Sequence, residues 1–505
     1  MPSQGIHKAS RRELLIILVL AAIPLAVKVA RYPDYPGSDD AFIHLSIVRN
    51  LSHGFGWGIA QGTRVNMSTS PLFTMLLAGL ASAGLSGIVP GQVVSGICAM
   101  VGIVCIHRVT VLLCDVSWMR ILSVVLAAFQ VHLWRWTGVV METTMTSVFV
   151  VVAFYAYYHI LNQDSDQWQR WFVLGMILGG GYLVRPELGI LLATFLISLF
   201  FVPKQGGTRA FVSTLGGFAV VAGSWVGFCH LYFGSIEPTS YYAKTTAFHV
   251  WNQVVAKQIG EVILSGCVFS LLLICTLATG LAWSTRREGS RSRRHELLPA
   301  LVFPLALLGF YLTKTTYLQS PGRYCLPAVS TIPFVVSILG REYRGAKRLP
   351  VIKVFGILCL CGHVAMMLYV NEKYIVPVLR DFKGNYWSTM RQAASAVGER
   401  CKAGDKVLVE TDIGVVSYEA HGVCEVADGG GLASPELQGL SLREQMARSG
   451  AEYVIQSLGS SPHELARGEP SLIPMGVWPF RSHSVGEGGR VYYCNLYRVS
   501  HPGGL

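Results

Sequence analysis

Charged residues are scarce in this chain. Only 14% of its 505 residues are Asp, Glu, Lys or Arg, whereas 52% are hydrophobic and the mean hydropathy is +0.45. Soluble domains carry about 25% charged residues, so this composition excludes a large soluble enzyme and predicts a membrane protein with many spans. The formal net charge of +12 does not indicate nucleic-acid binding, because the basic residues gather in short loops where membrane topology explains them.

The motifs of nucleotide-driven and zinc-dependent chemistry are also missing. The sequence has no Walker loop, no G-x-G-x-x-G after a strand, no H-E-x-x-H and no G-x-S-x-G. The glycine loop at Asp428–Gly431 lacks the following Lys-Ser/Thr that phosphate binding would need. His44, His53 and His132 are too scattered to form a recognisable metal set. These absences disfavour an energised pump and predict no metal site or organic cofactor, although a divalent cation remains compatible with the sequence.

Cysteine provides little framework for a disulfide-rich fold. Most of the twelve cysteines lie in or beside apolar runs and are typical of small core residues. Cys401, Cys424 and Cys494 lie in the polar C-terminal region. If that region is extracytoplasmic, one disulfide can form among the three and the remaining thiol stays free.

Long apolar runs are abundant and predict eleven membrane crossings. The first, 13–30, follows Lys8, Arg11 and Arg12 and has no small-residue cleavage site, so we expect a retained span rather than a signal peptide. The other candidates are 91–113, 117–134, 143–161, 171–184, 187–203, 211–233, 259–283, 297–314, 324–340 and 352–370.

The distribution of basic residues orients these spans. Loops 203–210, 284–296 and 341–353 are rich in Lys and Arg and should be cytoplasmic. With the N-terminus inside, all three loops are cytoplasmic only if the apolar stretch 71–89 does not cross the membrane. We therefore expect this stretch to be a re-entrant or surface-lying helix. The candidates for chemistry then converge on the external face: Asp39, Asp40, Glu142, Arg185, Glu187, Lys244 and Arg323.

Residues 371–505 differ in character from residues 1–370. Gly, Glu, Asp and Ser become more frequent, and the apolar runs shorten to strand length. The sequence therefore predicts a transmembrane catalytic domain over 1–370 and a small extracytoplasmic α/β domain over 371–505. The expected strands are 406–410, 423–426, 453–456 and 490–499, and the expected helices are 385–401 and 442–449.

The strongest chemical signal is the adjacent pair Asp39-Asp40, which closely follows the first span. Two carboxylates at the edge of a membrane are costly unless they face water or a partner. One could act as a general base on a sugar hydroxyl, with Asp39 as the first choice. The alternative is an N-cap for a helix over 41–51, whose irregular apolar pattern suits a helix lying at the membrane interface. A single Asp would satisfy that alternative, so the pair favours function.

Three further acidic or basic residues interrupt apolar sequence. Glu142 precedes a span, where it could act in catalysis or only favour the helix dipole. Arg185-Pro186-Glu187 separates two apolar segments. Arg185 could hold a phosphate or a sugar hydroxyl with its fixed donor fork, or the Arg–Glu pair could simply neutralise itself.

Other candidates for binding substrate lie near the same face. Lys244 follows Tyr241 in an aromatic loop and could bind a lipid phosphate, or the loop could be an interfacial anchor. Arg323 begins a span and could bind phosphate or merely snorkel. His44, close to the Asp pair, is a further candidate for substrate binding.

Short motifs recur along the chain in a fixed order: Asp39–Ile43, Arg49–Gly56, Ser70–Phe73, Gly138–Thr143, Arg185–Glu187, Pro238–Lys244, Gly322–Tyr324, Glu410–Gly414 and Ala427-Asp428 with Gly431-Leu432 just after. This order resembles the polyprenyl-phosphate-dependent glycosyltransferases of the GT-C fold. Within that superfamily the chain is most similar to the bacterial arabinofuranosyltransferase group, which includes transferases of mycobacterial cell-wall arabinan and relatives that modify pilins.

The resemblance implies a bacterial inner-membrane enzyme with its active site outside. It would move a sugar, arabinofuranose as the best choice, from a polyprenyl phosphate to a glycan, lipid or pilin-like protein. It also implies Asp39 or Asp40 as the base and Arg185, Lys244 and Arg323 on the donor side. One departure concerns Glu142, because Val139-Val140 stand where the family has small residues.

Two alternatives from other classes remain open on the sequence alone. One is a transporter or flippase for a lipid-linked sugar, although such proteins tend to have paired repeats and charges at mid-span. The other is a non-catalytic component of a polysaccharide assembly complex.

Overall fold

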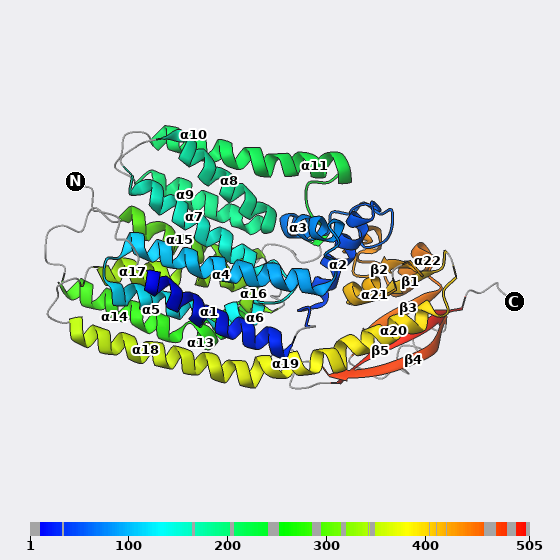
Figure 1. The fold of residues 1–505 in the computed structure, drawn as a ribbon. Coiled ribbons are helices and arrows are strands. Elements are labelled where there is room, and N and C mark those ends of the chain that lie inside the picture. Colours follow the sequence, from blue (N-terminus) through cyan, green and yellow to red (C-terminus); the bar gives the residue numbers. More distant parts are fainter. Residues whose placement is uncertain are drawn as a thin grey trace.

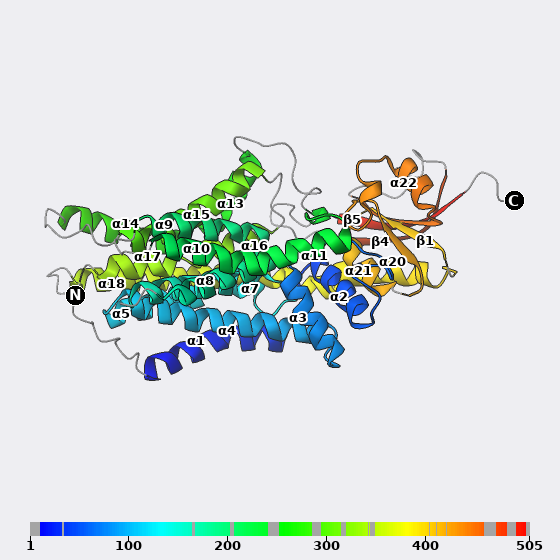
Figure 2. The same ribbon diagram turned by 90° about the horizontal axis from the view of Figure 1, so that it is seen from above.

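A long helical bundle and a small sheet domain make up the two ends of the molecule, with two short helices between them (Figures 1 and 2). The short helices are α2 (Asp39–Ser52) and α3 (Pro71–Ser82). The computed structural model describes residues 11–32, 35–163, 167–201, 207–240, 252–284, 294–314, 320–341, 343, 349–402, 404–410, 412–420, 422–458, 471–481 and 491–500.

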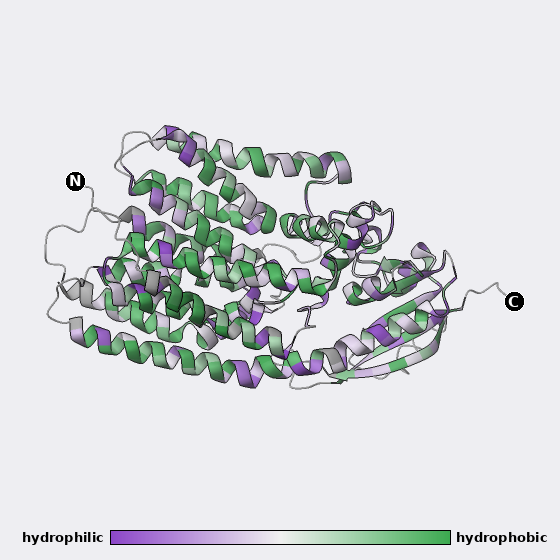
Figure 3. Cartoon of the chain, viewed as in Figure 1, coloured by the Kyte–Doolittle hydropathy of each residue, from purple (hydrophilic) through white to green (hydrophobic). Residues whose placement is uncertain are grey.

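The bundle is apolar on its outer faces, which suits contact with lipid (Figure 3). Its helices are α1 (Arg11–Arg31), α4 (Ile88–Leu113), α5 (Ser117–Ala128), α6 (Val131–Trp136), α7 (Thr143–Leu161), α8 (Trp168–Val184), η1 (Pro186–Leu188), α9 (Gly189–Leu199), α10 (Gly207–Phe218), η2 (Ala219–Gly223), α11 (Ser224–Phe233), α13 (Gln253–Gly266), α14 (Val268–Ser284), α15 (Arg294–Lys314), α16 (Pro321–Val329), α17 (Ile332–Arg341) and α18 (Leu349–Val370).

Within the described residues, six helices are long and apolar enough to cross a membrane, or up to seven if one bent pair is counted as a span. That pair is α13 and α14, which meet at an angle of 81° where the sequence predicted one span over 259–283. Hydropathy does not report the direction of a helix axis, so the bend was invisible in the sequence. Pro71–Ser82, Ser117–Ala128 and Pro186–Leu199 are shorter apolar helices. Eleven crossings and a re-entrant 71–89 therefore stay predictions.

The C-terminal domain is a five-stranded mixed sheet in the order β2-β1-β3-β5-β4. Strand β1 pairs in parallel with β2 and β3, whereas β5 pairs antiparallel with β3 and β4. The strands are β1 (Lys406–Val409), β2 (Glu425–Asp428), β3 (Tyr453–Leu458), β4 (Leu472–Arg481) and β5 (Val491–Val499). The helices are α20 (Ser388–Gly398), α21 (Ile413–Glu419), η6 (Pro435–Leu437) and α22 (Leu442–Ser449).

Sequence patterns located four of these strands and missed β4. Its segment contains Pro474, Gly476 and Pro479, which are unusual inside a sheet. β4 is an edge strand, and proline is tolerated there because one side of the strand needs no ladder donors.

The last apolar helix does not stop at residue 371. α18 continues through η4 (Asn371–Ile375), α19 (Val376–Asp381) and η5 (Phe382–Trp387) into α20, as the yellow ribbon in Figure 1 shows. A disulfide between Cys401 and Cys424 fastens the end of this helix close to β2. The sequence left three pairings open, and the structure selects this one, with Cys494 buried and free.

Helix α2 belongs as much to the C-terminal domain as to the bundle. Most of its residues are buried, including Ala41, Phe42 and Ile47. They join one apolar cluster with Val409 and Ile413 of the C-terminal domain. The prediction of a helix lying at the membrane surface is therefore wrong, because protein covers this helix on more than one side.

Candidate active site

The two adjacent carboxylates of α2 have different partners. The Arg323 guanidinium donates to Asp40, with 2.5 Å between Nη1 and Oδ2. Asp39 instead accepts hydrogen bonds from the backbone N–H groups of Gly414 and Val415, each at 2.9 Å. The N-cap of α2 is Ser38, whose side chain makes no capping hydrogen bond. One acid therefore faces the bundle and the other faces the C-terminal domain.

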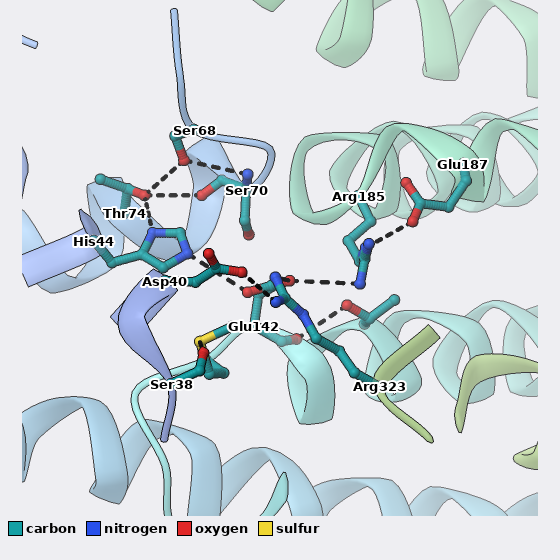
Figure 4. A network of polar contacts seen from close by, with 12 residues as sticks. Ser38, Asp40, His44, Ser68, Ser70, Thr74, Glu142, Arg185, Glu187 and Arg323 are labelled. Atoms are coloured by element: carbon teal, nitrogen blue, oxygen red, sulfur yellow. Dashed lines mark hydrogen bonds and ion pairs between the residues drawn. The ribbon is translucent and has the colours of Figure 1, made fainter. Parts of the chain in front are cut away.

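Glu142 lies at the centre of the ionic network on the bundle side (Figure 4). Its side chain is fully buried at the start of α7, and Oε1 lies 2.9 Å from Arg323 Nη2 and 3.6 Å from Arg185 Nη1. Burial acts to raise the pKa of Glu142, but Arg323, His44 and Arg185 together hold it well below its usual value. These partners favour the charged form of Glu142, whose carboxylate orients two arginines.

Arg185 is held between an acid and an aromatic ring. Its Nε lies 2.7 Å from Glu187 Oε1, and Tyr311 donates to the same Glu187 oxygen at 2.8 Å. The guanidinium also stacks over the Tyr324 ring, 4.6 Å from the centroid. The break between α8 and η1, which Pro186 enforces, places Arg185 and Glu187 at this point.

His44 connects the network to helix α3. Its Nδ1 lies 2.9 Å from Thr74 Oγ1, and its Nε2 lies 3.5 Å from Glu142 Oε2. Thr74 in turn donates to the Ser70 carbonyl and contacts the Ser68 hydroxyl (Figure 4). The short helix α3 therefore supports the site, as its position between bundle and sheet domain suggests.

Carboxylates outnumber guanidinium groups in this network. Asp40, Glu142 and Glu187 bring three carboxylates against the two guanidinium groups of Arg185 and Arg323. Asp40 is the most accessible of the three acids, with a side chain 24% exposed against 13% for Glu187 and 0% for Glu142. An anionic ligand here would need a further positive charge or a rearranged arginine.

Asp39 has the environment of a base. Burial is the main cause that raises its pKa well above the usual value, followed by the negative charge of Asp412. The two backbone hydrogen bonds lower the pKa without reversing the effect, and Asp40 raises it slightly. A carboxyl with a raised pKa is a better proton acceptor once it is ionised.

Asp412 and Tyr386 are neighbours that the sequence did not single out. Burial and the charge of Asp40 raise the pKa of Asp412 to about 6, although its interaction with Tyr386 acts in the opposite direction. Burial, Asp412 and Asp39 likewise raise the pKa of Tyr386. The only sequence signal was that Asp412 lies in the Glu410–Gly414 motif; its approach to α2 is a tertiary contact.

The structure brings six of the predicted site residues into one polar network and places Asp39 next to it, beside Asp40. The six residues are Asp40, His44, Glu142, Arg185, Glu187 and Arg323. Tyr241 and Lys244 lie outside the described residues. Over the part of the chain that is described, no group of three or more His, Cys, Asp or Glu side chains could hold a metal ion.

Comparison with known families and structures gives a consistent result. The family model described as dolichyl-phosphate-mannose-protein mannosyltransferase matches residues 68–232, which include α3, Glu142 and Arg185. No curated protein sequence matches the chain.

Solved structures resemble the whole fold at low sequence identity. ArnT from Cupriavidus metallidurans bound to undecaprenyl phosphate has a TM-score of 0.60 at 11% identity, over 96% of this chain and 98% of that one. The Archaeoglobus fulgidus oligosaccharyltransferase tethered to an acceptor peptide has a TM-score of 0.54 at 12% identity, over 88% and 69%.

A mycobacterial protein also shares the fold. A mutant of the arabinofuranosyltransferase AftD has a TM-score of 0.57 at 14% identity, over 98% of this chain and 42% of that one. The helical bundle and the small sheet domain thus share the GT-C fold of these membrane proteins, and the family model matches part of the bundle.

Proposed function

We propose that this protein transfers a sugar from a polyprenyl-phosphate donor to an acceptor on the outer face of the bacterial inner membrane. The observation that carries the proposal is the arrangement of charges where the bundle meets the C-terminal domain. Two oriented arginines lie on the bundle side, and Asp39 lies beside them against the C-terminal domain. A lipid-linked donor would enter from the bundle, and an acceptor would approach from the sheet domain.

The donor side consists of Arg185, Arg323 and the predicted Lys244. The lipid phosphate is the leaving group, so positive charge near its oxygens lowers the barrier to departure. Because carboxylates already pair with both arginines, Lys244 would supply the additional charge that a phosphate needs. Undecaprenyl phosphate bound to ArnT and dolichol phosphate bound to the archaeal oligosaccharyltransferase support a ligand of this class.

On the acceptor side, Asp39 is the general base. Asp40 is neutralised by Arg323, and Glu142 is fully buried among cations, so both are poor proton acceptors. Asp39 is partly exposed and has a raised pKa. It takes the proton from an acceptor hydroxyl as that oxygen attacks the anomeric carbon and the bond to the lipid phosphate breaks.

Arabinofuranose is our choice of sugar, and a cell-envelope glycan, lipid or pilin-like protein is our choice of acceptor. The sequence motifs and the fold shared with AftD support the sugar. The Cys401–Cys424 disulfide supports an external C-terminal domain, because such bonds persist in oxidising compartments.

The test measures donor binding and turnover separately in Asp39→Asn. Binding of a polyprenyl-phosphate sugar is measured by titration, and transfer by the amount of labelled acceptor formed. We expect Asp39→Asn to bind the donor as wild type does and to lose about 10²- to 10⁴-fold in turnover. Glu425→Gln, which removes an exposed acid of β2, is the matched control. Full turnover by Asp39→Asn would rule out this base.

A further inference from the structure

Helix α21 begins in an unusual way. Asp412 occupies its N-cap position with φ 56°, in the left-handed region that non-glycine residues seldom adopt, and its side chain makes no capping hydrogen bond. The hydrogen bonds of a cap come instead from Asp39 of α2, which accepts from the N–H groups of Gly414 and Val415. One domain therefore provides the carboxylate that completes a helix of the other.

The two helices are matched along their lengths. A Cβ on Gly414 would overlap the Asp39 carbonyl oxygen and lie 2.9 Å from both carboxylate oxygens, so this close approach requires glycine. Further along α2, Arg49 donates to the Tyr418 carbonyl at 2.9 Å and to the Ser417 carbonyl at 3.3 Å. Its guanidinium also lies 4.9 Å from the centre of the Tyr418 ring. Contacts at both ends thus fix the position of α2 against α21.

We propose that α21 is a positioning element of the active site, in which Asp412 at the N-cap and the N–H groups of Gly414 and Val415 surround the Asp39 carboxylate and fix its orientation. This inference rests on the proposed role of Asp39. It makes the C-terminal domain part of the catalytic centre itself, in addition to any role in holding the acceptor.

Each component has a distinct physical effect. The two N–H groups hold the carboxylate oxygens in place, since a charge-assisted pair of hydrogen bonds fixes its orientation. The charged and titratable groups facing Asp39 are Asp40 on its own helix, Asp412 before α21, and Tyr386 on η5. Arg323 neutralises Asp40, so the charge of Asp412 is the main one that disfavours ionised Asp39 and preserves its basicity.

The first test uses Asp412→Asn, because asparagine tolerates the left-handed conformation while losing the charge. Removal of a negative neighbour lowers the pKa of Asp39, so we expect the acidic limb of the kcat/KM profile to move to lower pH. Glu425→Gln should leave the profile unchanged. A profile for Asp412→Asn that coincides with wild type would overturn the role of Asp412.

The second test addresses the N–H groups. Gly414→Ala should displace Asp39 and lower kcat about 100-fold, as a misplacement of about 1 Å can do, with little change in the KM for the donor. Val415→Pro removes one of the two N–H donors in the first turn of α21 and should lower kcat about tenfold. An intact Cys401–Cys424 disulfide in both variants controls for folding of the C-terminal domain.

These outcomes separate the inference from the function on which it rests. Activity retained in Asp39→Asn would remove the proposed base and the inference with it. An inactive Asp39→Asn, together with wild-type behaviour of the Asp412, Gly414 and Val415 variants, would refute only the positioning role.

Discussion

Loss of Arg323 should be costly to the fold, because this residue joins two acids at once. Arg323→Met removes the partner of Glu142 at 2.9 Å and the partner of Asp40. Glu142 is fully buried, and breaking a buried ion pair from one side costs about 3–5 kcal/mol. Asp40 contributes less, because its side chain is 24% exposed and can be hydrated.

Denaturant unfolding in detergent micelles, followed by tryptophan fluorescence, measures this cost. Arg341→Met is the matched control, because Arg341 pairs with Glu296 in a more exposed setting, at 22% and 17% side-chain exposure, and should cost about 1 kcal/mol. Adding Glu142→Gln to Arg323→Met should restore part of the lost stability, because the buried charge that has lost its nearest partner disappears. Equal costs for the Arg323 and Arg341 variants, or no recovery in the double variant, would refute this account of the network.

Three further outcomes are expected. Replacing Cys401 and Cys424 by serine should lower the free energy of unfolding of the C-terminal domain by about 3 kcal/mol, as expected for a sequence separation of 23; an unchanged denaturant midpoint would contradict this. Folding raises the pKa of Asp412 to about 6, so its contribution to stability is lost as the pH rises from about 4 to 6. Asp412→Asn should therefore be about 2–3 kcal/mol more stable than wild type at pH 8 and equal to it below pH ~4. A variant less stable than wild type at pH 8 would contradict a raised pKa of Asp412. Gly322→Ala should lose transfer activity because its Cβ would overlap His132. Adding His132→Ala should restore part of that activity. Wild-type activity of Gly322→Ala alone would rule out this close packing.

Much of the bundle side of the site was predictable from the sequence. Glu142, Arg185 and Arg323 are charged residues at the ends of apolar runs, where an unpaired charge is costly. The expected cytoplasmic position of the basic loops placed these three residues on one face, and the structure joins them in one network. Which acid would pair with which arginine could not be predicted, because these pairs join residues from different helices.

The environment of Asp39 depends on contacts with the C-terminal domain, which local sequence patterns do not reveal. Helix α21 is only 7 residues long, too short for periodicity to reveal, and its N–H groups reach Asp39 across more than 370 positions of sequence. Asp39 and Asp40 were therefore interpreted from the sequence as one pair, whereas the structure gives them separate partners. The burial of α2 was missed for the same reason, since the C-terminal domain covers it.

The central claim is tested most directly by following both products of a single reaction. Purified protein in proteoliposomes is given a polyprenyl-phosphate arabinofuranose labelled in the sugar and, separately, in the lipid, together with a membrane acceptor. We predict labelled acceptor and free polyprenyl phosphate in equal amounts, and neither product with Asp39→Asn. Movement of the intact lipid-linked sugar across the bilayer, with no labelled acceptor from this or any other polyprenyl-phosphate sugar, would contradict the proposed transfer reaction.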